Sequence, residues 1–194
     1  MEIETDILHK MANYFGKDTK RINHALKVYG FAAMIAGREK LSQAEADTVR
    51  IAAILHDIGI HEAERKYGSS SGVYQEMEGP SIAWEILYEF NLDNDMLGRI
   101  LYLIGNHHSY TEIDGTDFQI LVEADFLVNI YEDGIKKEAI TKIKENIFKT
   151  KTGIRLLTAL YIEKVPFNVF ISEFLDSDQP LFTGAANIFS DIMD

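Results

Sequence analysis

The segment "AAILHDIGI" (residues 52–60) places an imidazole and a carboxylate, those of His56 and Asp57, in an otherwise apolar stretch. Such a stretch is typical of a protein core, and burying a charge is costly unless the charge is paired or coordinates a metal ion. The two residues therefore need a partner. An ion pair within the core is one possibility, and a metal site shared with other His and Asp residues is the other.

Four further residues with metal-binding side chains lie in or directly after apolar runs. His24 lies in "RINHALKVYGFAAMIAG" and Asp125 in "ILVEADFLVNI", while His107 and His108 follow "ILYLIGN". Two or three neutral imidazoles with two carboxylates suit Mn, Fe, Mg, Co or Zn. The simpler alternatives are a core His24 bonded to a carbonyl and an Asp125 paired with a basic side chain. A His pair at a helix C-terminus is also favoured by the helix dipole alone.

The elements that carry these residues are expected to be helices. Apolar residues recur at helical spacing over most of the chain, and no convincing alternating strand appears. Ser42 and Glu45 predict a capping box that opens a helix running to His56. Adjacent residues on a helix point about 100° apart. His56 and Asp57 therefore share one ion most easily at a helix end, which we expect near Gly59.

The remaining pattern predicts an all-α fold, with one domain of about eight to ten helices covering residues 1–194. Pro80 is expected at the first position of a helix, where its missing N–H costs least. The Gly- and Ser-rich stretch "YGSSSG" at 67–72 predicts a loop. The other expected helices cover residues 3–15, 20–37, 80–91, 94–105, 117–133, 136–148, 152–163, 167–175 and 184–193.

The composition excludes several classes of protein. Lys and Arg number 19 against 31 Asp and Glu, a net charge of −12, so the basic footprint of a protein that binds a nucleic-acid polymer is missing. A small phosphorylated substrate can still bind if a cation in the site reverses the local sign of the field. The sequence has no Cys, which excludes disulfides, thiolate nucleophiles and cysteine-type zinc sites.

Targeting and membrane signals are not evident. The start, "MEIETDILHKM", is acidic and amphipathic, without the basic and apolar regions of a signal peptide. No apolar run approaches the roughly 18 residues of a membrane span. We therefore expect a cytoplasmic protein that does not associate with a membrane.

The order of these motifs resembles the HD superfamily of metal-dependent phosphohydrolases. One His, the "LHDIG" segment, a His pair and a distant Asp follow one another, and "EGPSIAWEIL" and "ILVEADFLVN" also look like their counterparts there. The resemblance implies a helical HD-domain core at 21–133, with helices at 136–194 packed onto it. It also implies hydrolysis of a phosphomono- or phosphodiester, often of a nucleotide, by metal-activated water. The four metal ligands that it implies are His24, His56, Asp57 and Asp125.

Two positions depart from the family pattern. Members with two metal ions usually carry a His about four residues before the Gly that corresponds to Gly79, where this chain has Gln75. Glu76 or Glu78 would then have to supply a ligand in its place, or the second ion would be absent. Nucleotidase and alarmone-hydrolase members often carry a Glu where this chain has Ile60. We therefore expect one or two divalent ions per chain and leave the substrate open.

The resemblance and the residue types suggest roles for the remaining side chains. Asp57 would be a ligand and, through its free oxygen, would orient or deprotonate the water. His107 or His108 would hold a second metal ion together with Glu76, or would steady the leaving oxygen. An ion pair with Asp57 is the simpler explanation of His61. The candidate substrate-binding residues are Arg21, one turn before His24, then His61, and Lys66 beside the 67–72 loop.

Two other functions stay open at this point. The departures at Gln75 and Ile60 also fit a regulatory module that binds a nucleotide or a metal ion without turnover. Some HD-fold proteins use two irons and O₂, so a di-iron oxygenase is the second alternative. The apolar C-terminal third is expected to be core, and aromatic residues exposed there would make a homodimer interface.

Overall fold

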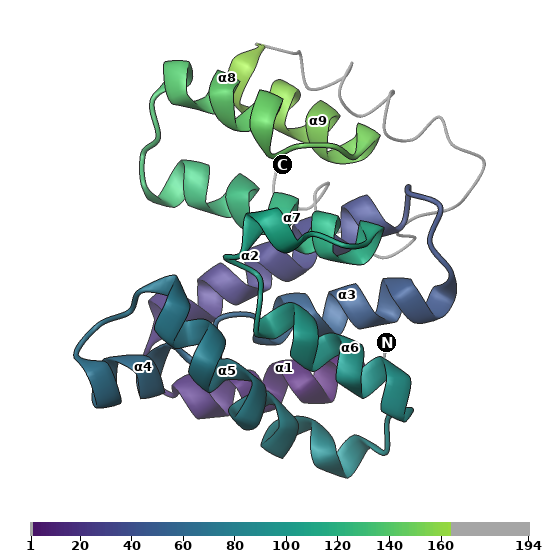
Figure 1. Ribbon diagram of the computed structural model, residues 1–194, viewed down its shortest axis with the longest axis vertical. Helices are drawn as coiled ribbons and strands as arrows, with labels where there is room; N and C mark the ends of the chain where they lie inside the picture. Colours follow the sequence, from purple (N-terminus) through teal and green to yellow (C-terminus); the bar gives the residue numbers. More distant parts are fainter. Residues whose placement is uncertain (1, 164–194) are drawn as a thin grey trace, which may run out of the picture.

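The computed structural model describes residues 2–163, and over this range the chain forms nine α-helices and no β-strand (Figure 1). This confirms the expected all-α fold, while the helices expected at 167–175 and 184–193 lie outside the described residues. Three short elements, η1 (Tyr88–Phe90), η2 (Tyr110–Glu112) and the π-helical η3 (Thr158–Ile162), connect or extend the α-helices. The α-helices are α1 (Glu2–Phe15), α2 (Thr19–Ala36), α3 (Gln43–Leu55), α4 (Ile60–Tyr67), α5 (Gly72–Leu87), α6 (Asn94–Ile104), α7 (Thr116–Glu132), α8 (Lys137–Asn146) and α9 (Lys151–Leu157).

The two ends of α3 follow the sequence signals. At its start, the Ser42 side chain accepts a hydrogen bond from the backbone N–H of Glu45, and the Glu45 carboxylate accepts one from the backbone N–H of Ser42. This is the expected capping box. At its other end, α3 stops at Leu55, so His56 and Asp57 lie in the turn before α4. The expected helix end at the His–Asp pair is therefore confirmed, although α3 stops at Leu55 rather than near Gly59.

The start of α5 differs from the expectation. Pro80 is predicted at a first helical position, but α5 begins at Gly72 and holds Pro80 in its interior. A proline there leaves the carbonyl of residue i−4, Glu76, without its helical donor. This part of α5 packs closely on the end of α6, since a Cβ added at Gly105 would lie 3.1 Å from Pro80 Cγ. We attribute the continuous helix to this packing, which outweighs the local preference of proline.

The core is built around α3 and α7. Helix α3 packs against α1, α2, α6 and α7, and α7 packs against α2, α3 and α9. Helix α7 is buried without interruption from Asp117 to Asp125, which explains why its sequence lacks a clear polar face. In Figure 1, α8 and α9 lie beyond α7, on the side of the molecule away from α4 and α5. Within the described range, none of the helices is both long and apolar enough to cross a membrane.

A buried carboxylate fastens the loop between α8 and α9 to α7. Glu123 is fully buried and accepts hydrogen bonds from the backbone N–H groups of Lys149 at 2.6 Å and Thr150 at 2.8 Å. The side-chain amide of Gln119 donates a further bond to Glu123 at 2.8 Å. Each partner satisfies part of the hydrogen-bonding capacity of a carboxylate that would otherwise be costly to bury. Glu123 is thus a structural acid, distinct from the acids discussed below.

The turn after Asp57 lies against the backbone of α5 and allows no side chain at Gly59. A Cβ at this position would lie 2.6 Å from the carbonyl oxygen of Gln75 and 2.6 Å from the backbone nitrogen of Gly79. We expect Gly59→Ala to lower the free energy of unfolding by about 1–3 kcal/mol, the usual cost of overpacking. Urea titration would measure this difference.

Gly98→Ala provides the matched control, because Gly98 lies within α6 and a Cβ there meets nothing within 4 Å. This control should raise the free energy of unfolding by about 0.5–1 kcal/mol through helix propensity alone. Equal effects of the two substitutions would contradict the close approach at Gly59.

Candidate metal centre

Helices α2 and α7 and the turn after α3 bring four of the expected ligands together. The Nε2 atom of His24 lies 3.2 Å from Nε2 of His56 and 3.2 Å from Oδ1 of Asp125. The Oδ2 atom of Asp57 lies 3.6 Å from the Nε2 atoms of both His24 and His56. The ligand atoms of His24, His56 and Asp57 all lie within 4.8 Å of one another, close enough to hold one metal ion. Residues far apart in the sequence thus converge on one small volume.

A second group shares Asp57 with the first. Its other carboxylate oxygen, Oδ1, lies 3.4 Å from Nε2 of His107, in the turn that follows α6. His108 completes a set in which all ligand atoms again lie within 4.8 Å of one another. Burial, together with the neighbouring His107, lowers the pKa of His108 to about 4, so its imidazole is neutral at neutral pH. The carboxylate of Asp57 therefore has one oxygen for each group.

Hydrogen bonds on the outer nitrogens fix the orientation of two imidazoles. Nδ1 of His56 lies 2.9 Å from the carbonyl oxygen of Ala53, and Nδ1 of His107 lies 2.8 Å from that of Ile104. A carbonyl only accepts, so Nδ1 must carry the proton in each ring. The lone pair of Nε2 is then free in the neutral ring, and it faces the cluster. This is the arrangement that metal-ligating histidines adopt.

The outer nitrogen of His24 has a carboxylate partner that sequence reasoning did not single out. Nδ1 of His24 lies 3.0 Å from Oε2 of Glu132, and the same carboxylate pairs with Lys27. Glu132 lies two helical turns after Asp125, on the same side of α7. That spacing could have pointed to Glu132, but the last turn of a helix is usually solvated. A carboxylate behind a metal-binding imidazole raises its basicity and fixes its orientation.

The electrostatics of the cluster favour a cation. Burial lowers the pKa of His24, but the carboxylates of Asp125 and Asp57 outweigh burial and raise the pKa to about 9. Burial raises the pKa of Asp57, yet His56 and His107 outweigh it and hold the pKa well below its usual range. For His56 itself, burial dominates and lowers the pKa. Two carboxylates therefore stay charged beside imidazoles, and a divalent cation would replace the proton on His24.

Arg21 and His61 share an acid that the sequence did not indicate. Nη1 of Arg21 lies 2.7 Å from Oδ2 of Asp18, and Nη2 lies 2.6 Å from Oε1 of Glu64. Nε2 of His61 lies 3.1 Å from the same oxygen of Asp18. The expected ion pair of His61 with Asp57 is therefore wrong. The backbone turns between the two residues, so the helical i+4 relation between them does not exist.

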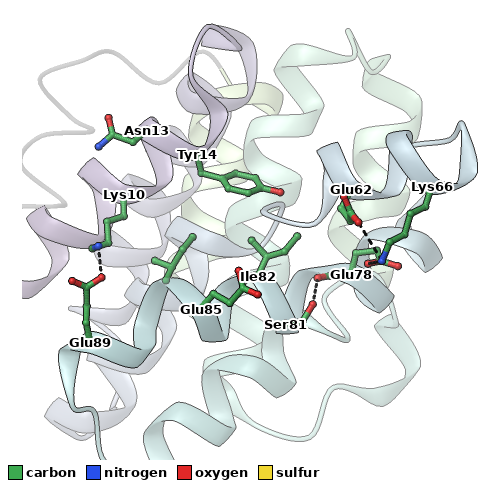
Figure 2. A pocket seen from close by; sticks show the side chains of 11 residues that line it. Lys10, Asn13, Tyr14, Glu62, Lys66, Glu78, Ser81, Ile82, Glu85 and Glu89 are labelled. Carbon is green, nitrogen blue, oxygen red and sulfur yellow. Dashed lines mark hydrogen bonds and ion pairs between the residues drawn. The ribbon is translucent and has the colours of Figure 1, made fainter.

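Lys66 and Glu78 pair outside the cluster. Nζ of Lys66 lies 2.6 Å from Oε2 of Glu78 and 3.2 Å from Oε1 of Glu62. All three side chains line a pocket of about 800 Å³ between α1, α4 and α5, which Figure 2 shows with Lys10 and Glu89 paired at its other end. None of the residues that line this pocket belongs to the two groups around Asp57. The carboxylate of Glu78 is thus already paired with the ammonium group of Lys66.

The side chain of Glu76 contacts the backbone of His108 in the second group and not the ligand atoms of that group. Its Oε1 atom accepts hydrogen bonds from the backbone N–H of His108 at 2.9 Å and from Oγ of Ser109 at 3.1 Å. The carboxylate thereby ties α5 to the turn that follows α6. In this arrangement Glu76 holds His108 in place.

Comparison with known proteins agrees with this geometry. A family model for the HD domain matches residues 21–146, well over half of the chain. The chain belongs to the HD domain family. Among solved structures, it is similar to a predicted HD superfamily hydrolase from an uncultured Thermotogales bacterium, with 26% sequence identity, 88% of each chain covered and a TM-score of 0.59. No curated protein matches the chain.

Membership of the HD family places the chain among metal-dependent hydrolases, and HD domains bind divalent metal ions. The donor set of this HD domain fits such an ion, because carboxylate oxygens and imidazole nitrogens face one another at short distance. In addition, Nε2 of His107 and Nε2 of His108 are buried without a hydrogen-bond partner among the described residues. Buried polar atoms of this kind require a partner, and a cation would provide one.

Glu132→Gln tests the role of the carboxylate behind His24. Loss of its charge should weaken binding of the first divalent ion by about 10-fold or more, as for other second-sphere partners of metal ligands. Titration of the metal-free HD domain with Mn²⁺ would measure the affinity. Glu138→Gln is the matched control, since Glu138 is exposed on α8. Unchanged affinity in Glu132→Gln would mean that Glu132 serves only to pair with Lys27.

His61→Ala should lower hydrolytic activity less than tenfold, since the contact of this ring with Asp18 lies outside both ligand groups. We expect only a small decrease in activity, because Asp18 would lose one of the partners that position it beside Arg21. Steady-state kinetics would measure it. A loss as large as that caused by replacing Asp57 would instead place His61 in the reaction itself.

Proposed function

We propose that this HD domain is a metal-dependent phosphohydrolase that cleaves a phosphomono- or phosphodiester of a nucleotide or another small phosphorylated metabolite. The observation that carries the proposal is the position of Asp57, whose two carboxylate oxygens each face a different group of imidazoles. Such an arrangement would let one carboxylate bind a metal ion in each of the two groups. Membership of the HD family and the similarity to a predicted HD superfamily hydrolase support a metal-dependent hydrolase.

The charge of the chain supports a role for the cation in substrate binding. With a net charge of −12, the protein repels a phosphate unless the local field is reversed. A divalent ion held by His24, His56, Asp57 and Asp125 would reverse it, and when bound it acts as a Lewis acid that polarises a phosphoryl oxygen and lowers the pKa of water. Mn, Fe, Mg, Co and Zn all fit this mixed set of nitrogen and oxygen donors.

The side chains around the ion would take the remaining catalytic roles. The carboxylate of Asp57 would orient the attacking water or act as its base. His107 or His108 would bind a second ion or steady the oxygen of the leaving group. Hydrogen bonds to the carbonyls of Ala53 and Ile104 keep two of the imidazoles in position for these roles.

Arg21 is the best placed of the proposed substrate-binding residues. It lies one turn before His24 on α2 and can bind a phosphate with two parallel hydrogen bonds. In the structure both of its terminal nitrogens are bonded to carboxylates, those of Asp18 and Glu64. Phosphate binding would therefore require Arg21 to exchange one of these partners. Lys66 would contribute only after release from Glu78.

A di-iron oxygenase is the second candidate, because two groups of ligands that share one carboxylate also suit a pair of iron ions. Mixed-valence iron in the purified protein, together with O₂ consumption, would favour it. Binding of a nucleotide without any release of phosphate would instead favour a regulatory module.

Asp57→Asn provides the decisive test. We expect elemental analysis to find a divalent metal in the wild type, and a screen of nucleotides and other phosphate esters with Mn, Mg, Co and Fe to find phosphate release. Asp57→Asn should lose most of the metal and the activity, since it removes the one charged group that both ligand groups share. Full metal content and full turnover in this variant would show that the site lies elsewhere.

A further inference from the structure

The second group of ligands has fewer donors than the first, and α5, which approaches the ring of His108 at Gly72, carries a buried amide oxygen. Gln75 is only 6% exposed, and its Oε1 atom has no hydrogen-bond partner among the described residues. Its Nε2 atom donates a hydrogen bond of 2.7 Å to the carbonyl oxygen of Ser70. Since that carbonyl can only accept, the amide cannot turn over without placing two acceptors against each other. The orientation of the free oxygen is therefore fixed.

Contacts along α5 place Gln75 between the turn of Asp57 and the ring of His108. The carbonyl oxygen of Gln75 borders Gly59, two residues after Asp57. One turn earlier on the same side of α5, a Cβ at Gly72 would lie 2.5 Å from Cδ2 of His108, the ring atom bonded to Nε2. The next residue, Glu76, binds the backbone of His108. The N-terminal half of α5 therefore covers this group.

Three buried polar atoms of α5 and of the turn after α6 have no hydrogen-bond donor among the described residues. They are Oε1 of Gln75, Nε2 of His107 and Nε2 of His108. Buried polar atoms are nearly always satisfied, so several unsatisfied acceptors on neighbouring elements call for a common partner. A cation is the partner that all three can bind at once, and Asp57 Oδ1 supplies the charge that attracts it.

We propose that Oε1 of Gln75 is a ligand of a second divalent cation, which it binds together with Asp57, His107 and His108. This inference rests on the proposed function for the existence of the metal centre, and it goes further by assigning the ligand that completes the second site. An amide oxygen in place of an imidazole makes this site harder, which favours Mg²⁺ or Mn²⁺ over Zn²⁺. Glu76 is then a positioning residue, because its carboxylate accepts a hydrogen bond from the backbone N–H of His108.

Metal binding to the full-length chain tests this assignment without reference to turnover. The metal-free protein would be titrated with Mn²⁺, with bound ions counted by elemental analysis and ion pairs detected by electron paramagnetic resonance. We expect two equivalents and a spin-coupled signal in the wild type. Gln75→Met keeps the shape of the side chain but removes its oxygen. It should weaken the second equivalent by about 10-fold or more and abolish the coupled signal, with the first equivalent unchanged.

Two further variants sharpen the result. Gln75→Glu keeps an oxygen and adds a charge, so it should tighten the second equivalent, and it guards against a folding defect in Gln75→Met. Gln43→Met is the matched control, because Gln43 is exposed on α3 and should leave both equivalents unchanged. Two equivalents of wild-type affinity in Gln75→Met, or a single equivalent in both the wild type and Gln75→Glu, would overturn the assignment.

The failure of this inference can be told apart from the failure of the proposed function. A wild type that binds one ion and releases phosphate, with Gln75→Met identical to it, would remove Gln75 from the ligands and leave the hydrolase intact. A wild type that binds no divalent ion at all would overturn both.

Discussion

The two oxygens of the Asp57 carboxylate lie 3.4–3.6 Å from the Nε2 atoms of three imidazoles, those of His24, His56 and His107. A carboxylate in such a position is costly unless positive charge surrounds it. The rest of the structure supplies that surrounding, since α2 contributes one ring and the turns after α3 and α6 contribute the other two. Asp125 of α7 then adds a second negative charge, which makes a proton or a metal ion necessary rather than optional.

The C-terminal ends of α3 and α6 orient two of these imidazole rings. His56 follows α3 and His107 lies in the turn after α6, and each donates its Nδ1 proton to the carbonyl three residues earlier. The last carbonyls of a helix have no partner within the helix. The same bond therefore satisfies the backbone and points Nε2 into the cluster. His24 lies in the middle of a helix, where the carbonyls are already used, and it relies on Glu132 instead.

The distribution of charge separates the cluster from the pocket between α1, α4 and α5. The pocket between α1, α4 and α5 carries more acidic than basic side chains, and its Lys residues are paired with Glu (Figure 2). An anion would find no free cation there. The cluster around Asp57, by contrast, gains positive charge as soon as a divalent ion binds. The cluster therefore suits the proposed chemistry on a phosphate better than this pocket does.

The sequence by itself determined the helices and the residue types of the site. Interactions within a few residues determine the capping box at Ser42, the end of α3 at the His–Asp pair and the polar residues on apolar faces, and a pattern records such interactions directly. The same reasoning failed at Pro80, where packing of α5 on α6 outweighs the local preference of proline. Local rules therefore located the candidate ligands but not every helix boundary.

Only the tertiary structure decided which of these side chains meet. Glu132 lies behind His24, 108 positions away, and Asp18 rather than Asp57 binds His61. Glu76 faces the backbone of His108, so Gln75 is the neighbour whose oxygen stays free. Such pairings depend on how helices cross and how turns direct the chain. No short-range pattern encodes them, because the interacting residues become neighbours only when the core is packed.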